Sequence, residues 1–184
     1  MARFAPVSAV AGEARPVQFL LMARLLWDKG LAEYVEAARI VRAACASRGV
    51  AVEFCVAGQG DIGNPSAVPR EALDRWVAEG VVRYLGFVED VRPLIAAADV
   101  VVLPSYREGT PRALLEAAAM GKPLVATDVP GCREAVRDGE TGVLCAARDA
   151  RGLADAMLRM VDAGEDGRAQ MGRAGRAYVE AKFD

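Results

Sequence analysis

Two glutamates separated by seven residues, Glu108 and Glu116, stand where the sequence has its clearest chemical pattern. The apolar run 100–103 indicates a strand buried on both faces, and a polar loop carrying Glu108 follows it. A helix is expected to begin at Pro111, with Thr110 as its N-cap. A carboxylate in a loop between a strand and an open helix N-terminus is typical of ligand sites in open α/β sheets.

Glu116 is expected inside an otherwise apolar helix, because Ala-Leu-Leu precedes it and Ala-Ala-Ala-Met follows it. A carboxylate in such surroundings is costly unless it has a partner, such as a ligand hydroxyl or a cation. On spacing alone, the two glutamates would belong to a charged loop and a solvated helix face. The apolar context favours a binding role over that alternative.

Two cations, Arg24 and Lys29, follow the first expected strand and precede Gly30. By frequency alone they would be ordinary surface cations. The loops that follow parallel strands lie at one edge of the sheet, however, so both cations and the amides of a helix N-terminus beside Gly30 would face one point. In physical terms this is a diphosphate site, although the P-loop pattern G-x-x-x-x-G-K-[ST] does not occur.

The segment 58–63 matches the pattern G-x-G-x-x-G, which is found in dinucleotide-binding folds. Prolines at 65 and 69 delay the next helix, and no acidic residue ends the next strand, so an NAD site is rejected. The simpler interpretation is a tight turn. Gly58 and Gly60 would still let the backbone approach a ligand closely.

Histidine is absent from all 184 residues. This excludes Ser-His-Asp and Cys-His catalysis and most zinc sites. The four cysteines are scattered without a C-x-x-C pair, so they are expected to be reduced and inert. Chemistry is therefore left to carboxylates, Arg, Lys, hydroxyls and backbone amides.

The net charge of −2 gives no electrostatic reason to expect binding to nucleic acid. No apolar run approaches the ~20 residues that span a bilayer. The first fifteen residues lack the continuous apolar segment of a signal peptide, so a cytoplasmic location is expected.

Apolar strands alternate with amphipathic helices along the chain, which predicts an α/β fold with a doubly wound parallel sheet of about six strands. Residues 1–16 have no periodicity and are predicted to be a linker, and 17–184 form one domain. The expected strands are 17–23, 52–57, 81–85, 100–103, 123–127 and 142–145. The expected helices are 31–47, 70–79, 91–98, 111–120, 133–136, 150–163 and 168–182.

Five segments together resemble the family-4 glycosyltransferases of the GT-B fold: ARLLWDKG (23–30), VAGQGD (56–61), LGFVEDV (85–91), residues 103–136 with their E-x7-E element, and DGETGVL (138–144). The match covers almost the whole chain from Val17. It implies the Rossmann-like, C-terminal half that binds the nucleotide sugar, with the acceptor-binding N-terminal domain absent and residues 1–16 as the interdomain linker. Within that family, the motifs most resemble those of the bacterial enzymes that synthesise surface polysaccharides and lipid-linked oligosaccharides.

The resemblance implies a role for each matching residue. Arg24 and Lys29 would bind the diphosphate and, with Glu108, form the catalytic set. Glu108 would hydrogen-bond the transferred sugar, and Glu116 would accept from the ribose hydroxyls. The remaining donor-binding residues implied are Gly58 and Gly60, the backbone of Arg83, Tyr84 and Leu85 near the base, and Gly109, Thr110, Pro111, Arg112 and Leu115 near the sugar and β-phosphate.

The implied activity is transfer of a sugar, with retained anomeric configuration and no metal or other cofactor, to a lipid-linked or saccharide acceptor. UDP-sugars are favoured over GDP-sugars by resemblance, and the chain alone is expected to transfer nothing. Contact with the inner face of the membrane would come only through the missing domain. A non-catalytic nucleotide-binding module of the same fold is the main alternative, and an epimerase or phosphorylase of similar build is a third.

Overall fold

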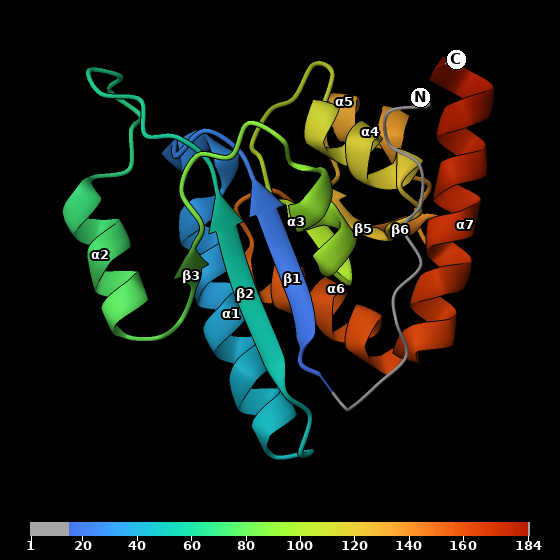
Figure 1. Cartoon of the computed structure of the whole chain (residues 1–184), viewed down its shortest axis with the longest axis horizontal. Coiled ribbons are helices and arrows are strands. Elements are labelled where there is room, and N and C mark those ends of the chain that lie inside the picture. The colour runs from blue at the N-terminus through green and yellow to red at the C-terminus, as the bar shows by residue number, and fades with distance from the viewer. Residues whose placement is uncertain (1–14, 184) are drawn as a thin grey trace.

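Six parallel strands form one sheet in the order β3-β2-β1-β4-β5-β6, and helices pack on both of its faces (Figure 1). The computed structural model describes residues 15–183. The predicted α/β class and doubly wound parallel sheet are confirmed. The strands are β1 (Val17–Met22), β2 (Val52–Ala57), β3 (Arg83–Tyr84), β4 (Val100–Leu103), β5 (Leu124–Thr127) and β6 (Gly142–Cys145).

The helices divide between two hydrophobic cores, one on each face of the sheet, because alternate strand residues point to opposite sides. Phe19, Leu21 and Phe54 pack on the side of α1, α2 and α6, whereas Leu20 and Cys55 pack on the side of α3, α4, α5 and α7. The helices are α1 (Leu31–Ala46), α2 (Arg70–Ala78), α3 (Arg92–Ala97), α4 (Arg112–Ala119), α5 (Pro130–Ala135), α6 (Ala150–Asp162) and α7 (Gly164–Phe183), with a short 3₁₀ turn η2 (Trp27–Lys29) before α1.

The chain order of the sheet reverses between β1 and β4, which lie side by side in its middle. From β1 the chain moves outward to β2 and β3, and then returns to β4 and continues outward to β5 and β6. The loops after β1 and β4 therefore leave the carboxyl edge in opposite directions. In open α/β sheets, ligands bind in the crevice at such a switch point.

Four predicted boundaries are wrong in detail. The third strand is only two residues long instead of 81–85, because the Val81 amide donates to the Trp76 carbonyl and closes the end of α2. Helix α4 begins at Arg112, and Pro111, not Thr110, is its N-cap, since the Pro111 carbonyl accepts the first helical hydrogen bonds. Helices α5 and α7 begin three and four residues earlier than predicted, at Pro130 and Gly164.

The predicted linker lies almost entirely outside the described residues, which begin at Arg15. The Arg15 guanidinium forms two hydrogen bonds with the Asp99 carboxylate, of 2.8 and 3.0 Å. The same carboxylate accepts from the Gln18 amide, so the start of β1 is fixed to the start of β4.

All four cysteines are free and buried. Burial raises the pKa of the Cys132 thiol to about 11 and that of Cys145 to about 12. Thiols with raised pKa values are poor nucleophiles, so these side chains serve as small apolar core residues. Among the helices of the described chain, none is both long and apolar enough to cross a bilayer.

The fold makes a sharp prediction at Gly58, which follows β2 directly. A Cβ atom there would lie 1.7 Å from the Ala23 carbonyl oxygen, and φ is +156°. Because the obstacle is backbone at the end of a central strand, Gly58→Ala is expected to lower the free energy of unfolding by about 1–3 kcal/mol or more, measured by urea unfolding followed by circular dichroism. Gly60→Ala is the matched control, since nothing lies within 4 Å of its added Cβ. Equal urea midpoints for the two variants would contradict this account of the turn.

Candidate functional site

The loops after β1 and β4 meet at the switch point through an ion pair between Lys29 and Glu108. The Lys29 Nζ lies 2.6 Å from Glu108 Oε1, and the two side chains are only 21% and 11% exposed. A backbone hydrogen bond of 2.8 Å from the Tyr106 amide to the Asp28 carbonyl joins the same two loops. Residues 79 positions apart in sequence thus form the floor of the site.

Glu108 has a second partner on the same oxygen. The Ser105 hydroxyl donates to Glu108 Oε1 at 2.6 Å. In the described part of the chain, both hydrogen bonds to this carboxylate therefore fall on Oε1. The carboxylate is held by two donors from one side, which fixes its orientation.

Arg24 lies at the rim of the site. Its side chain is 64% exposed and pairs with Asp61 of the β2–α2 loop at 3.1 Å, and Asn64 donates to the same carboxylate oxygen. The two predicted diphosphate cations therefore follow the same strand at different depths. Lys29 is a floor residue and Arg24 is a rim residue.

The glycine-rich segment after β2 forms a loop between the ends of β1 and β3, and not the start of a helix. The Gly58 amide donates to the Gly86 carbonyl, and the Tyr84 hydroxyl donates to the Gly58 carbonyl at 2.7 Å. This geometry agrees with the rejection of a dinucleotide fingerprint, which requires a helix directly after the glycines. Gly60 lies in open space.

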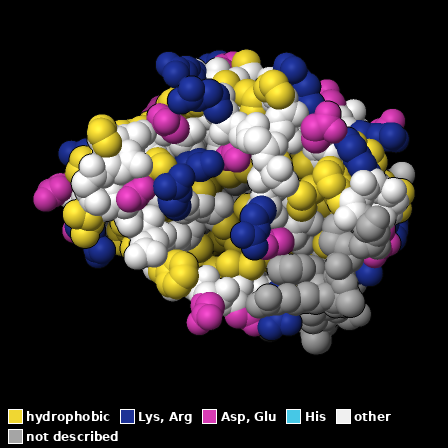
Figure 2. Space-filling view, turned by 90° about the horizontal axis from the view of Figure 1, so that it is seen from above, with side chains coloured by type: hydrophobic (Ala, Val, Ile, Leu, Met, Phe, Trp, Pro, Cys, Tyr) yellow, Lys and Arg dark blue, Asp and Glu magenta, His cyan; other side chains and the backbone are white. Residues whose placement is uncertain are grey.

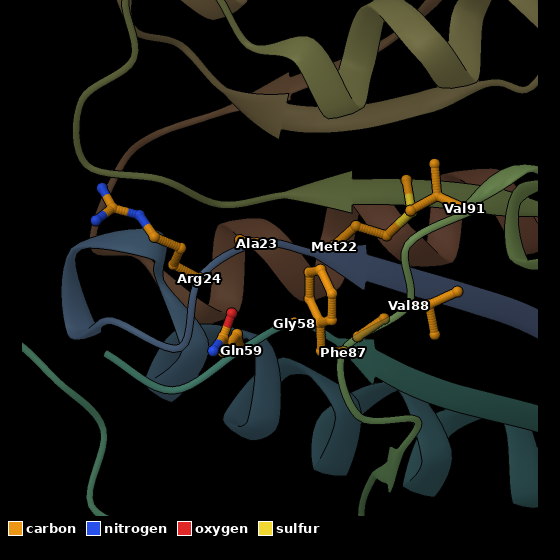
Figure 3. A pocket seen from close by; sticks show the side chains of 9 residues that line it. Met22, Ala23, Arg24, Gly58, Gln59, Phe87, Val88 and Val91 are labelled. Atoms are coloured by element: carbon orange, nitrogen blue, oxygen red, sulfur yellow. The ribbon is translucent and has the colours of Figure 1, made fainter. Parts of the chain in front are cut away.

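A cavity of about 210 Å³ lies beside this loop, at the ends of β1 and β2. Figure 3 shows the Phe87 ring standing among Met22, Gly58 and Val88, whereas the Arg24 guanidinium extends away from them. Phe87 is 67% exposed, which is unusual for a large apolar side chain. An exposed aromatic ring at an apolar hollow is suited to a flat ligand group.

The backbone start of α4 lines a second, smaller cavity of about 130 Å³. Predicted site residues Gly109, Thr110, Pro111 and Leu115 all contribute to its wall. Phe183 at the end of α7 also lines this cavity.

Three other predicted donor-binding residues, Arg112, Arg83 and Leu85, lie farther from the Lys29–Glu108 ion pair or within the sheet. Arg112 is highly exposed and lies 3.9 Å from Glu116, so a cation faces the carboxylate that the sequence placed in an apolar helix. The Arg83 side chain pairs with Glu53 near the start of β2, away from the carboxyl edge. The Leu85 amide donates to the Val56 carbonyl within the sheet.

Tyr106 is a residue that sequence reasoning missed. Its hydroxyl donates to Glu33 Oε1 at 2.7 Å, and the Arg148 guanidinium lies 4.4 Å from the centre of its ring. Arg148 has a φ of +59°, the only positive value of a non-glycine residue in the described chain. Tyr106 thereby fastens the Glu108 loop to the start of α1. A lone tyrosine in a loop has no periodicity that would have revealed this.

The face at the carboxyl ends of the strands carries basic and acidic side chains around a central hollow with apolar side chains in it (Figure 2). Among residues 15–183, no three or more Cys, Asp or Glu side chains gather as a group that could hold a metal ion. The site thus offers paired cations and carboxylates, backbone that is open to a ligand at Gly60 and Gly109, and one aromatic surface. These groups suit a ligand that is anionic at one end and flat at another.

Comparison with known proteins places this arrangement in context. The sequence family described as "Glycosyl transferases group 1" matches residues 16–163. The chain is 34% identical over 143 residues to N,N'-diacetylbacillosaminyl-diphospho-undecaprenol alpha-1,3-N-acetylgalactosaminyltransferase of Campylobacter jejuni, covering 78% of this chain and 35% of that protein. It is 33% identical over 178 residues to the amylovoran biosynthesis glycosyltransferase AmsK of Erwinia amylovora, covering 92% of this chain and 42% of that protein.

Solved structures show the same fold. Sucrose-phosphate synthase from Thermosynechococcus elongatus aligns over 100% of this chain and 46% of its own, with a TM-score of 0.80 and 28% identity. The Anabaena protein HepE, solved in complex with UDP, aligns over 92% of this chain and 45% of its own, with a TM-score of 0.79 and 25% identity. The chain therefore spans less than half the length of these proteins.

The Tyr106 anchor predicts a dependence of stability on pH. Burial, followed by the hydrogen bond and the negative charge of Glu33, raises the pKa of Tyr106 from 10.0 to about 12. In this pH window the unfolded chain loses the phenolic proton and the folded chain retains it, so the stabilisation is complete below about pH 10 and is lost as the pH rises to about 12. Tyr106→Phe is expected to flatten this alkaline fall in the free energy of unfolding, measured by urea titrations at a series of pH values.

Glu33→Gln provides the matched variant, because it removes the negative charge and keeps an acceptor for the Tyr106 hydroxyl. Its alkaline fall is expected between those of the wild type and Tyr106→Phe. Identical falls in all three proteins would show that Tyr106 is not anchored as described.

Proposed function

Because the chain belongs to the group 1 glycosyl transferases of the GT-B fold, we propose that it is the donor-binding half of a retaining sugar transferase. The donor is a nucleotide-diphosphate sugar, with UDP favoured. The acceptor is a saccharide or a lipid-linked saccharide in cell-surface polysaccharide synthesis. The observation that carries this proposal is the meeting of Lys29 and Glu108 at the switch point, with Arg24 at the rim.

The diphosphate would lie between Arg24, Lys29 and the backbone amides at the start of α4. Both cations are now paired with carboxylates, Arg24 with Asp61 and Lys29 with Glu108. A diphosphate would compete for these charges, and the helix dipole would add to the attraction. Fixed positive charge of this kind stabilises the negative charge that develops on a leaving diphosphate, and our proposal requires no metal ion for that step.

The sugar would lie over Glu108. Since Lys29 and Ser105 both bind Oε1, Oε2 is the oxygen left to accept from sugar hydroxyls. Glu116, one turn into α4 and facing Arg112 at 3.9 Å, would accept from the ribose. A bound sugar would then exchange hydrogen bonds with a carboxylate whose orientation is already fixed.

The base would enter the cavity of about 210 Å³ beside Phe87. Stacking on an exposed ring and burial among Met22, Gly58 and Val91 suit a flat heterocycle. This adds an aromatic surface to the expectation that the backbone of residues 83–85 lies near the base. HepE is described in complex with UDP and with UDP-glucose, and the latter structure matches with a TM-score of 0.77 and 26% identity, which supports uridine as the base.

The relatives support the choice of acceptor class through their names, which refer to a diphospho-undecaprenol-linked saccharide and to amylovoran. The chain spans 35% and 42% of those two proteins. We therefore assign donor binding to this chain and transfer to a protein that also holds the other half.

Calorimetric titration of the chain tests donor binding directly. UDP and UDP-glucose are expected to bind, and uridine is expected to bind more weakly because it lacks the diphosphate. Arg24→Ala is expected to weaken both UDP and UDP-glucose about tenfold, the order of one charge-assisted hydrogen bond. Arg39→Ala is the matched control, since this exposed arginine pairs with Glu36 and Glu79 on the outside of α1. A wild-type chain that binds none of these nucleotides would refute the proposal.

Glu108→Gln separates a transferase half from a module that only binds nucleotides. The substitution preserves the shape and removes the charge on the sugar side, and because it frees Lys29 from its ion pair, the affinity for UDP should not fall. The ratio of UDP-glucose affinity to UDP affinity should fall about tenfold, because a hydrogen bond to a charged acceptor is lost. If Glu108→Gln changed neither affinity, Glu108 would have no role toward the sugar, and the non-catalytic module would be the better description.

A further inference from the structure

Two hydrogen bonds connect β5 to the Glu108 carboxylate through Ser105. The Thr127 hydroxyl donates to the Ser105 carbonyl at 2.5 Å, and the Ser105 hydroxyl donates to Glu108 Oε1 at 2.6 Å. Ser105 and Thr127 are two of only three buried polar or charged residues in the described chain, the third being Thr141. Burying a hydroxyl costs free energy unless it is hydrogen-bonded, so the Ser105 and Thr127 hydroxyls depend on these two hydrogen bonds.

These hydrogen bonds begin at a rigid place. Thr127 is the last residue of β5 and pairs with Cys145 of β6. Its hydroxyl also lies 4.0 Å from the buried Cys132 sulfur. The neighbouring Gly131 packs so tightly that an added Cβ would lie 2.3 Å from the Glu108 carbonyl oxygen. The sheet and α5 therefore support the Glu108 loop from behind.

Lys29 faces two demands at this site. It is the direct cationic partner of Glu108, and under the proposed function it also binds the donor diphosphate. If Lys29 were the only group that held Oε1, a diphosphate that attracted the lysine would release the carboxylate that must meet the sugar. Ser105 removes this conflict because its hydroxyl holds the same oxygen and carries no charge that a phosphate would attract.

We propose that Ser105 and Thr127 are positioning residues that keep Glu108 aimed at the sugar when the donor diphosphate draws Lys29 away. Thr127 acts through the Ser105 backbone, and Ser105 acts on the carboxylate itself. Neither residue touches the donor. The inference rests on the proposed function for its ligand and on the two hydrogen bonds for its mechanism.

Thr127→Val tests the role of the Thr127 hydrogen bond, because valine has the shape of threonine without the hydroxyl. The expected result is about a tenfold loss of affinity for UDP-glucose with the affinity for UDP kept within about twofold, measured by calorimetry. Thr127→Ser keeps the hydroxyl and is expected to restore the affinity for UDP-glucose. Ser105→Ala should reproduce the loss seen with Thr127→Val.

Thr141→Val is the matched control for stability. Thr141 is also buried, and its hydroxyl accepts from the Arg137 amide at 2.9 Å, far along the chain from Glu108. The Thr141→Val substitution should lower the unfolding temperature and leave the ratio of UDP-glucose affinity to UDP affinity unchanged. If Thr127→Val and Thr141→Val altered this ratio equally, or if Thr127→Ser failed to restore it, the positioning role would be wrong.

A readout without ligand separates this inference from the proposed function. The Ser105 hydroxyl proton, bonded to a carboxylate in a buried place, should exchange slowly and give its own NMR resonance. That resonance should shift in Glu108→Gln and in Thr127→Val, and keep its position in Thr127→Ser and Thr141→Val. A wild-type chain that binds no nucleotide would overturn the proposed function, and an unchanged resonance in Thr127→Val would overturn the positioning role.

Discussion

The ion pair between Lys29 and Glu108 is the constraint on which the geometry of the site depends. It joins the loops after β1 and β4, the two central strands at which the sheet reverses its order. A largely buried charge is unfavourable without its partner, so neither loop can move independently of the other. The Tyr106 amide, which donates to the Asp28 carbonyl, and the Tyr106 hydroxyl, which donates to Glu33, hold the same junction from the side of α1.

The site keeps its charges in pairs: Lys29 with Glu108, Arg24 with Asp61, and Arg112 with Glu116. Such pairing prevents isolated charges from being desolvated before a ligand arrives. It also means that an anionic ligand gains only the difference between its own contacts and those it replaces. The exposed pair at Arg24 is screened by water and is easily exchanged, whereas the more buried pair at Glu108 costs more to separate. Under the proposed function, a diphosphate that draws Lys29 away leaves the Ser105 hydroxyl as the donor that still holds Glu108.

The sequence predicted what local patterns determine. Buried apolar runs located the strands, and the loops after them brought Arg24, Lys29 and Glu108 to one edge. The predicted boundaries were wrong where a neighbouring element competed for a backbone group. The Val81 amide, for example, donates to the Trp76 carbonyl at the end of α2 and does not extend β3. The supporting contacts could not be predicted, because Ser105 and Thr127 are 22 residues apart and no periodicity connects a serine in a loop with the end of another strand. Tyr106 and Glu33 are 73 residues apart, and their contact exists only once α1 and the loop have packed.

Differences in burial divide the work of the site between affinity and selectivity. Arg24 and Phe87 are more than half exposed, so under the proposed function the ligand would have to order them, and water weakens the charge interactions of Arg24. Glu108 is 11% exposed and is already held by two donors. A fixed polar group at a largely buried position discriminates strongly between ligands, because a ligand without the matching hydroxyl leaves that group unpaired. Under the proposed function, exposed groups such as Arg24 and Phe87 suit the parts that all nucleotide-diphosphate donors share, and the fixed carboxylate of Glu108 suits the part in which they differ, the sugar.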